Sequence, residues 1–331
     1  MPDPSRSNLR GVVFALLAFA LFSSHDVIVK TLGSSYTPFQ IIFFSVLFGF
    51  PLASLMLMRD PTSGHLRPVH PWWTALRTGA TLVTGASAFF AFSTLPLTQV
   101  YAILFAAPLL ITILSIPILG ERVGLHRWFA VAVGLTGVLV VLRPGVEPLQ
   151  PGHLAAIVAA VGAAVASVIV RKIGKDERSV VMLLYPMVAN FVAMGMILPF
   201  VYRPLPAEDL GALAVMSALA LVAMLLLIAA YRRADAAVIA PMQYSQIIWA
   251  TLFGAWLFGE TPDRFTAIGA GIIILSGVYI VFREGRANVS ANQPVLRTRS
   301  RAATPATPRV TGIMNRMERS QSELETGDKE G

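Results

Sequence analysis

The sequence repeats itself at a spacing of about 140 residues, and this duplication limits the possible folds more than any other feature. A hydrophobic run that begins at Gly11 ends in Val27-Ile28-Val29-Lys30-Thr31-Leu32-Gly33. A second run begins at Gly152 and ends in Val168-Ile169-Val170-Arg171-Lys172-Ile173-Gly174, 141 positions later throughout. A chain that repeats a long segment in this way consists of two halves with the same plan.

Two further pairs of motifs extend the duplication towards the end of each half. A Gly-Glu pair closes a long apolar segment at Gly120-Glu121 and again at Gly259-Glu260. A Leu-Thr/Ser-Gly-Val segment follows at Leu135–Val138 and at Leu275–Val278. We therefore divide the chain into a tail (1–10), two repeats (11–145 and 146–285) and a polar segment (286–331) that is expected to be disordered and cytoplasmic.

The composition places both repeats in a membrane. Of the 331 residues, 55% are hydrophobic and only 13% are charged, and the mean hydropathy is +0.68. A soluble globule of this size needs more polar surface. Because the bilayer interior offers no water to backbone groups, the spanning segments should be helices, and the alternation typical of barrel strands is absent from the sequence. The expected fold class is an all-α integral membrane protein.

Ten apolar runs approach the length of roughly 20 residues that a helix needs to cross a bilayer. The predicted spans are Gly11–Leu32, Pro38–Met58, Trp73–Phe92, Gln99–Leu119, Trp128–Leu142, His153–Val170, Val180–Val201, Leu210–Tyr231, Ala236–Phe258 and Phe265–Phe282. The duplication then gives five spans to each repeat.

The basic residues indicate how the chain is oriented. Most Lys and Arg near the span ends fall on the side of the N-terminus, and the exceptions are Lys30, Arg143, Arg203 and Arg264. Because cytoplasmic loops carry an excess of Lys and Arg, both termini are expected in the cytoplasm, with the protein in the cytoplasmic (inner) membrane. The net charge of +8 is then a topology signal. No clustered basic face that would predict nucleic-acid binding occurs in the sequence.

Five spans per repeat is an odd number, so the second repeat should enter the membrane from the opposite side. Two inverted five-helix repeats related by an axis in the membrane plane are typical of alternating access, with a substrate site near the midplane. The sequence therefore predicts the geometry of a transporter.

Several motifs together indicate a known family. They are both Gly-Glu pairs, both Leu-Thr/Ser-Gly-Val segments, Pro108 in the fourth span and Ala236–Pro241 at the start of the ninth. With these the chain resembles the drug/metabolite transporter superfamily, in its ten-helix EamA-type branch. The resemblance implies a secondary carrier of small organic metabolites, among them amino acids, nucleosides, vitamins, S-adenosylmethionine and amine compounds. It also implies a central cavity lined by spans one, three, four, six, eight and nine.

The most costly residues lie in the first span. A carboxylate such as Asp26 within the bilayer costs roughly 2.5–3.5 kcal/mol unless it is paired or faces a cavity. Asp26, with His25 beside it, is therefore the leading candidate to take and release a proton or to contact a cationic substrate group. The alternative is an ion pair between Asp26 and Lys30, four residues later on the same helical face. For His25 the alternative is a hydrogen-bonded packing residue.

Other candidate site residues are polar or aromatic side chains in spans three, four and nine. Arg77 either extends to the cytoplasmic headgroups or binds an anionic group. Gln243, Tyr244, Gln246 and Trp249 follow Pro241, and they suit either a planar organic solute or hydrogen bonds between helices. Tyr101 and Phe105 form an aromatic pair that serves either ligand contact or packing. The two Gly-Glu pairs suit helix ends, or alternatively a gate.

The function that these features favour is secondary active transport of a small organic metabolite, coupled to protons. A passive facilitator, a channel or a lipid flippase on the same scaffold is the alternative. An enzyme is disfavoured because the sequence contains neither His-Glu-x-x-His nor Gly-x-Ser-x-Gly, and an ATP-driven pump because it contains no Gly-x-x-x-x-Gly-Lys-Ser/Thr. The expected partners are a metabolite (an amino acid, vitamin, nucleoside or S-adenosylmethionine-like compound), protons and membrane lipid, with no cofactor, metal or nucleic acid.

Overall fold

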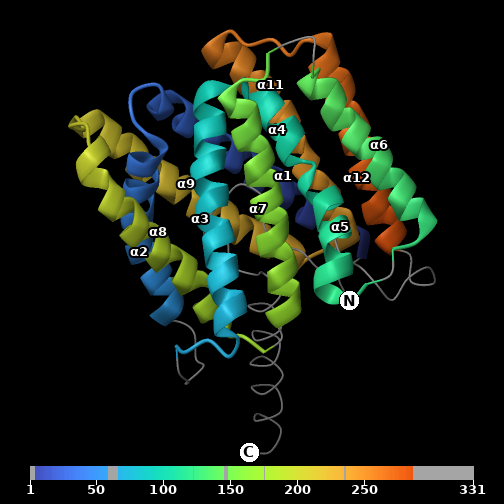
Figure 1. The fold of residues 1–331 in the computed structure, drawn as a ribbon, viewed down its shortest axis with the longest axis horizontal. Helices are drawn as coiled ribbons and strands as arrows, with labels where there is room; N and C mark the ends of the chain where they lie inside the picture. The colour runs from blue at the N-terminus through green and yellow to red at the C-terminus, as the bar shows by residue number, and fades with distance from the viewer. Residues whose placement is uncertain are drawn as a thin grey trace, which may run out of the picture.

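The computed structural model describes residues 4–58, 66–121, 123–144, 148–174, 176–234 and 236–285, and in these the regular structure is helical, without strands. The elements are α1 (Pro4–Gly33), α2 (Pro38–Met58), α3 (Pro71–Thr94), α4 (Leu97–Leu104), α5 (Ala107–Leu119), α6 (Leu125–Leu142), α7 (Pro151–Ile173), α8 (Ser179–Val201), α9 (Ala207–Tyr231), α10 (Ala236–Ile239), the 3-10 helix η1 (Ala240–Tyr244), α11 (Ser245–Phe258) and α12 (Arg264–Gly285). Figure 1 shows them as one bundle of roughly parallel and antiparallel helices. The all-α prediction is confirmed, and the polar segment after Gly285 lies outside the described residues.

Seven helices of the described chain are long and apolar enough to cross a membrane. They are Leu9–Gly33, Leu97–Leu119, Leu125–Leu142, Pro151–Ile173, Val180–Val201, Ala207–Tyr231 and Arg264–Phe282, and a shorter apolar helix runs over Pro38–Pro51. Large apolar side chains such as Phe200, Trp256 and Leu275 are exposed on the outside of the bundle. A surface of this kind requires lipid rather than water around it.

The structure interrupts two helices that the sequence analysis predicts as continuous. The predicted span Gln99–Leu119 is broken at Phe105–Ala106 into α4 and α5, and Ala236–Phe258 consists of α10, η1 and α11. Proline explains both corrections, since it has no backbone N–H to continue the hydrogen bonds of the preceding turn. Pro108 lies in the first turn of α5, and Pro241 lies in η1.

Other boundaries shift outwards from the hydrophobic runs. Helix α1 begins at Pro4, so residues 4–10 of the predicted tail are helical. Helix α6 begins at Leu125, three residues before the predicted span. Gly120 and Gly259 end α5 and α11 with left-handed φ values of 70° and 65°, a conformation that suits glycine at a helix terminus.

The helices pack mostly in pairs that combine the two halves of the sequence. Helix α1 packs on α9, α3 on α7, α2 on α8, and α6 on α12. The backbones of α6 and α12 approach each other closely. A Cβ added at Gly269 would lie 2.6 Å from the carbonyl oxygen of Gly137, and one added at Gly137 would lie 2.9 Å from that of Gly269. Small residues at this crossing let the two backbones approach.

Hydrogen bonds also join two helix connections that are far apart in the sequence. Gln40 Nε2 donates to the carbonyl oxygen of Arg203 at 2.7 Å, and the Arg203 N–H donates to Gln40 Oε1 at 2.9 Å. Tyr36 Oη donates to Asp209 Oδ2 at 2.5 Å, and this hydrogen bond raises the pKa of the Tyr36 phenol. These contacts fix the α1–α2 connection against the α8–α9 connection.

Candidate substrate and coupling site

Four of the predicted site residues meet in a buried hydrogen-bonded group around Asp26. His25 Nδ1 lies 2.8 Å from Asp26 Oδ1, and the Tyr101 hydroxyl donates to Asp26 Oδ2. Gln246 Nε2 donates to Tyr101 Oη at 3.3 Å. The relative exposures of Asp26, His25, Tyr101 and Gln246 are 2%, 3%, 2% and 1%. We refer to these four residues as the Asp26 cluster.

The chemistry of the cluster follows from its burial. A carboxylate away from water must accept hydrogen bonds, and bonds to a charged acceptor are about twice as strong as neutral ones. Tyr101 and His25 place one such bond on each oxygen of Asp26. The geometry fits Nδ1–H of His25 as the donor to an ionised carboxylate. The result is a buried chain of hydrogen bonds that connects three ionisable side chains, those of His25, Asp26 and Tyr101.

The helix breaks position this group. Tyr101 lies in α4, shortly before the break that separates α4 from α5, and Gln246 lies in the first turn of α11, directly after η1. Asp26 and His25 lie in α1, which packs against η1 and α11. The cluster therefore combines side chains from both halves of the sequence at two places where helices are discontinuous.

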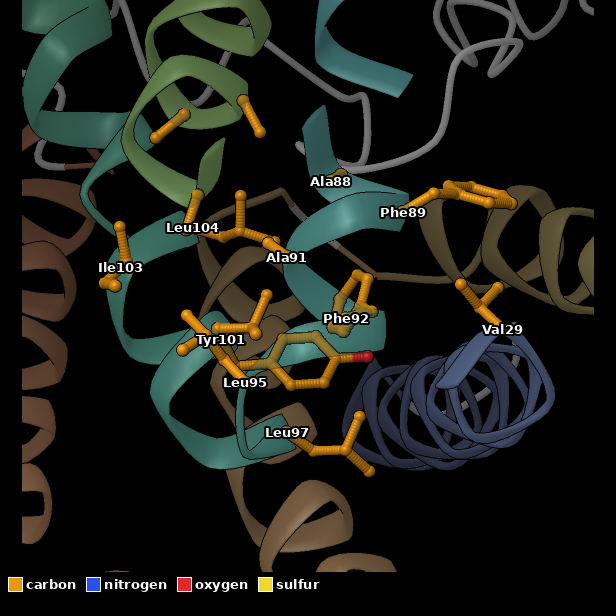
Figure 2. Packing of buried hydrophobic residues seen from close by; sticks show 14 of the residues in the cluster. Val29, Ala88, Phe89, Ala91, Phe92, Leu95, Leu97, Tyr101, Ile103 and Leu104 are labelled. Atoms are coloured by element: carbon orange, nitrogen blue, oxygen red, sulfur yellow. The ribbon is translucent and has the colours of Figure 1, made fainter. Parts of the chain in front are cut away.

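Aromatic rings surround the polar groups. Figure 2 shows Tyr101 with its hydroxyl directed towards α1, and Phe92 beside its ring. The ring centroids of Phe92 and Tyr101 are 5.4 Å apart, and those of His25 and Phe89 are 6.1 Å apart, both edge to face. Phe105 continues the series between Tyr101 and Tyr244. Such walls suit a planar organic group, and they strengthen the electrostatic contacts of Asp26 by excluding water.

Lys30 lies outside the cluster, contrary to the alternative in which it pairs with Asp26. Its ammonium Nζ lies 2.7 Å from Glu260 Oε1 and donates to the carbonyl oxygen of Leu95 at 2.6 Å. The side chain thus extends towards the Gly-Glu turn after α11. The four-residue spacing that suggests an intrahelical pair could not indicate a partner so distant in sequence.

Arg77 is buried in the protein and does not extend to its surface. Its relative exposure is 6%, and its Nη1 donates to the carbonyl oxygen of Met182 at 2.6 Å. That carbonyl lies four residues before Pro186 in α8, and proline has no N–H to bond it. Arg77 therefore supplies the donor that Pro186 removes, which is a structural role between α3 and α8.

The remaining candidates on η1 and α11 have different surroundings. Tyr244 packs against α12, where a Cβ added at Gly277 would lie 1.7 Å from its hydroxyl oxygen. Trp249 stacks on Phe253 with centroids 6.1 Å apart. Gln243 lies in η1. Of the two predicted glutamines, it is Gln246 that bonds Tyr101 in the Asp26 cluster. Trp249 Nε1 and Ser245 Oγ are buried and lack a hydrogen-bond partner in the described part of the chain.

Serine and threonine residues near the cluster were not among the predicted site residues. Ser23 Oγ lies 3.4 Å from Tyr101 Oη, and Thr98 Oγ1 lies 3.3 Å from Thr251 Oγ1 between α4 and α11. Ser and Thr are common in membrane helices, so their type alone is no signal. Spacing along α1 could have found Ser23, since it precedes Asp26 by three residues. Within the described residues, no group of three or more His, Cys, Asp or Glu side chains is placed to hold a metal ion.

Comparison with known families decides the identity. The sequence model of the EamA-like transporter family matches twice, over residues 9–143 and 150–283. The chain belongs to the EamA-like transporter family. The resemblance to the drug/metabolite transporter superfamily is confirmed, and the protein is a multi-pass membrane transporter, not an enzyme.

Curated relatives cover nearly the whole chain. An S-adenosylmethionine uptake transporter of Rickettsia prowazekii (strain Madrid E) is 28% identical over 295 residues, which is 88% of this chain and 99% of the relative. A riboflavin transporter of Rhizobium johnstonii is 26% identical, over 86% of this chain and 94% of the relative. The pseudopaline exporter CntI of Pseudomonas aeruginosa (strain UCBPP-PA14) is 25% identical, over 80% and 94%.

A solved structure shares the fold of this EamA-like protein. One crystal structure superposes with a TM-score of 0.57 at 20% sequence identity, covering 86% of this chain and all of the other. The likeness concerns the fold alone.

Proposed function

We propose that this EamA-like protein is a proton-coupled secondary transporter that moves a small organic metabolite across the cytoplasmic membrane by alternating access. The observation that carries the proposal is the Asp26 cluster, a buried group with a titratable carboxylate that both halves of the chain build. A carboxylate in a membrane helix marks a substrate or proton path by default. Relatives named for S-adenosylmethionine, riboflavin and pseudopaline support a small organic substrate.

The transport geometry is that of two inverted five-helix repeats, residues 11–145 and 146–285, with ten spans and both termini in the cytoplasm. The double match of the family model supports two repeats. So does the packing of α1 on α9 and of α7 on α3, because each first helix contacts the third span of the other half. Discontinuous helices at corresponding places, α4–α5 and η1–α11, are the arrangement that transporters use around a central substrate.

The substrate contacts the aromatic and amide groups beside Asp26. Trp249 Nε1 and Ser245 Oγ lie one turn apart on α11, and a buried donor without a partner costs free energy that a bound solute or water offsets. Aromatic faces from Phe92, Tyr101 and Phe105 suit the planar part of such a solute. The other site candidates, Lys30 and Arg77, act through the helices that they join.

Counterflow in proteoliposomes tests this proposal. Vesicles loaded with unlabelled S-adenosylmethionine or riboflavin should take up the labelled compound transiently above equilibrium, and the uptake should saturate. A carrier shows both properties because one site alternates between the two faces. Uptake that rises linearly with concentration and shows no counterflow would indicate a channel and contradict the proposal.

A further inference from the structure

Two ion pairs in this protein occupy equivalent places in the two repeats. Lys30 of the first repeat binds Glu260 of the second, with Nζ 2.7 Å from Oε1. Arg171 of the second repeat binds Glu121 of the first, with both guanidinium Nη atoms donating to the carboxylate. The bases lie at matching positions of the duplicated first helices, and the glutamates belong to the two Gly-Glu pairs. We call these pairs the Lys30 latch and the Arg171 latch.

A lysine in or beside each latch also contacts a backbone carbonyl, although the two lysines do not occupy equivalent positions, since Lys172 aligns with Thr31. Lys30 Nζ donates to the carbonyl oxygen of Leu95, at the end of α3, at 2.6 Å. Lys172 Nζ, next to Arg171, donates to the carbonyl oxygen of Ile118, near the end of α5, at 2.7 Å. In each latch an amine on a first helix thus satisfies a carbonyl at the end of another helix, where intrahelical donors run out. The contacts at each latch therefore connect the ends of several helices.

The two latches lie at opposite ends of one span. Glu260 Oε2 accepts a hydrogen bond from the N–H of Leu97, the first residue of the 23-residue span Leu97–Leu119. Glu121 lies two residues after Leu119, the last residue of the same span. At 1.5 Å per residue the ends of such a span are roughly 30 Å apart, the thickness of the hydrocarbon layer. Figure 1 shows the end of α5 at one end of the bundle and the α11–α12 connection at the other.

The Asp26 cluster lies between these ends. Asp26 precedes Lys30 by one helical turn, and Tyr101 follows Leu97 by one turn of α4. The Lys30 latch therefore covers the cluster from its own end of the bundle. Both latches are formed in the same structure, in which the Asp26 cluster is buried.

We propose that the two latches are the gates of the transporter, each holding one end of the substrate path closed and breaking when that end opens. This inference rests on the proposed alternating access. The charges suit a gate because three of the four side chains are partly exposed, Lys30 at 11%, Glu260 at 22% and Glu121 at 15%, while Arg171 is at 6%. When a latch opens, water hydrates both charges and offsets the lost attraction. The closed and open states then stay close in free energy, as alternation requires.

Single cysteines report on each gate, because the natural chain contains none. Thr98 and Ser115 are both buried, with exposures of 6% and 0%, near opposite ends of the span Leu97–Leu119. Thr98→Cys reports opening at the Lys30 latch, because it follows Leu97, whose N–H bonds Glu260. Ser115→Cys reports opening at the Arg171 latch, because the Glu121 N–H donates to the Ser115 carbonyl oxygen. The probe is a membrane-impermeant maleimide, added separately to each side of proteoliposomes that contain the full chain.

The gate proposal predicts opposite responses. Glu260→Gln should raise the labelling rate of Thr98→Cys about tenfold and should leave that of Ser115→Cys low. A tenfold rise corresponds to a loss of about 1.4 kcal/mol in the free energy that favours the closed gate. Glu121→Gln should do the reverse, from the other side of the membrane. The double variant Arg171→Glu/Glu121→Arg should return Ser115→Cys labelling towards its original rate. Asp263→Asn is the matched control, because it removes the charge that pairs with Arg143 near Glu260 and should change neither rate.

A rise of both labelling rates in both latch variants would show general loosening and overturn the proposal, as would no change in either. These outcomes are separate from a failure of the transport function. Labelling reports opening whether or not a chosen solute is carried, and counterflow with symmetric labelling would reject the latches while retaining the carrier.

Discussion

Asp26→Asn is expected to abolish proton-driven accumulation of substrate in proteoliposomes while leaving substrate exchange in place. The amide has nearly the shape of the carboxylate and still offers a hydrogen-bond acceptor to Tyr101, so the fold should be retained. It cannot release a proton, however, and a carrier that loses its titrating group no longer links solute movement to the proton gradient. The accumulated level should fall to that reached without a gradient, as measured with labelled solute under an imposed pH difference.

Asp263→Asn is the matched control for this experiment. Asp263 caps α12 by accepting hydrogen bonds from the backbone N–H groups of Phe265 and Thr266, and asparagine caps helices equally well. The same change of chemistry at the surface end of a helix should therefore leave accumulation intact. Gradient-dependent accumulation by Asp26→Asn at the original level would reject Asp26 as the coupling residue.

Gly269→Ala is expected to lower the thermal stability of the purified protein by several degrees. The added Cβ would lie 2.6 Å from both the carbonyl oxygen of Gly137 and the Cγ2 of Val141, closer than carbon and oxygen atoms pack. Because the first of these atoms belongs to the backbone, α6 and α12 must separate to accept the methyl group. Overpacking of this kind costs about 1–3 kcal/mol. A melting curve in detergent, followed by fluorescence, measures the change.

Gly271→Ala provides the control on the same helix. No heavy atom lies within 4 Å of a Cβ added at Gly271, and alanine is the better helix former by about 1 kcal/mol in water. The melting temperature of this variant should stay the same or rise slightly. Equal melting temperatures for the two variants would contradict the close packing of α6 on α12.

Patterns along the chain predicted the helices but not their interruptions. Hydropathy averages over about five turns, so an apolar run looks continuous even where the backbone breaks, as at Phe105–Ala106. Pro108 and Pro241 were visible in the sequence, yet a proline predicts either a kink or a break, and packing decides between them. Gly120 and Gly259 were better signals, because a left-handed helix end has a strong preference for glycine.

The free-energy cost of polar and charged side chains in membrane helices pointed to part of the candidate site. Asp26 and His25 were singled out because a carboxylate in a membrane helix requires a reason, and Gln246 because buried amides require partners. Tyr101 was noted only as half of an aromatic pair with Phe105. The partners of Lys30 and Arg77 could not be predicted in this way. Glu260 and Met182 are far from Lys30 and Arg77 in sequence. Which residues become partners at such distances depends on which helices pack together. The duplicated bases and the duplicated glutamates were the available signal for the two latches.

The most direct test of the inverted two-repeat arrangement is the sidedness of two equivalent exposed positions. Ser35 follows α1, and Asp176, 141 positions later, follows α7. Single-cysteine variants at these positions should react with an impermeant maleimide from opposite sides of the membrane in intact cells and inverted vesicles, Ser35→Cys from outside and Asp176→Cys from the cytoplasm. Reaction of both cysteines from the same side would contradict inverted repeats, and with them the alternating path through the Asp26 cluster.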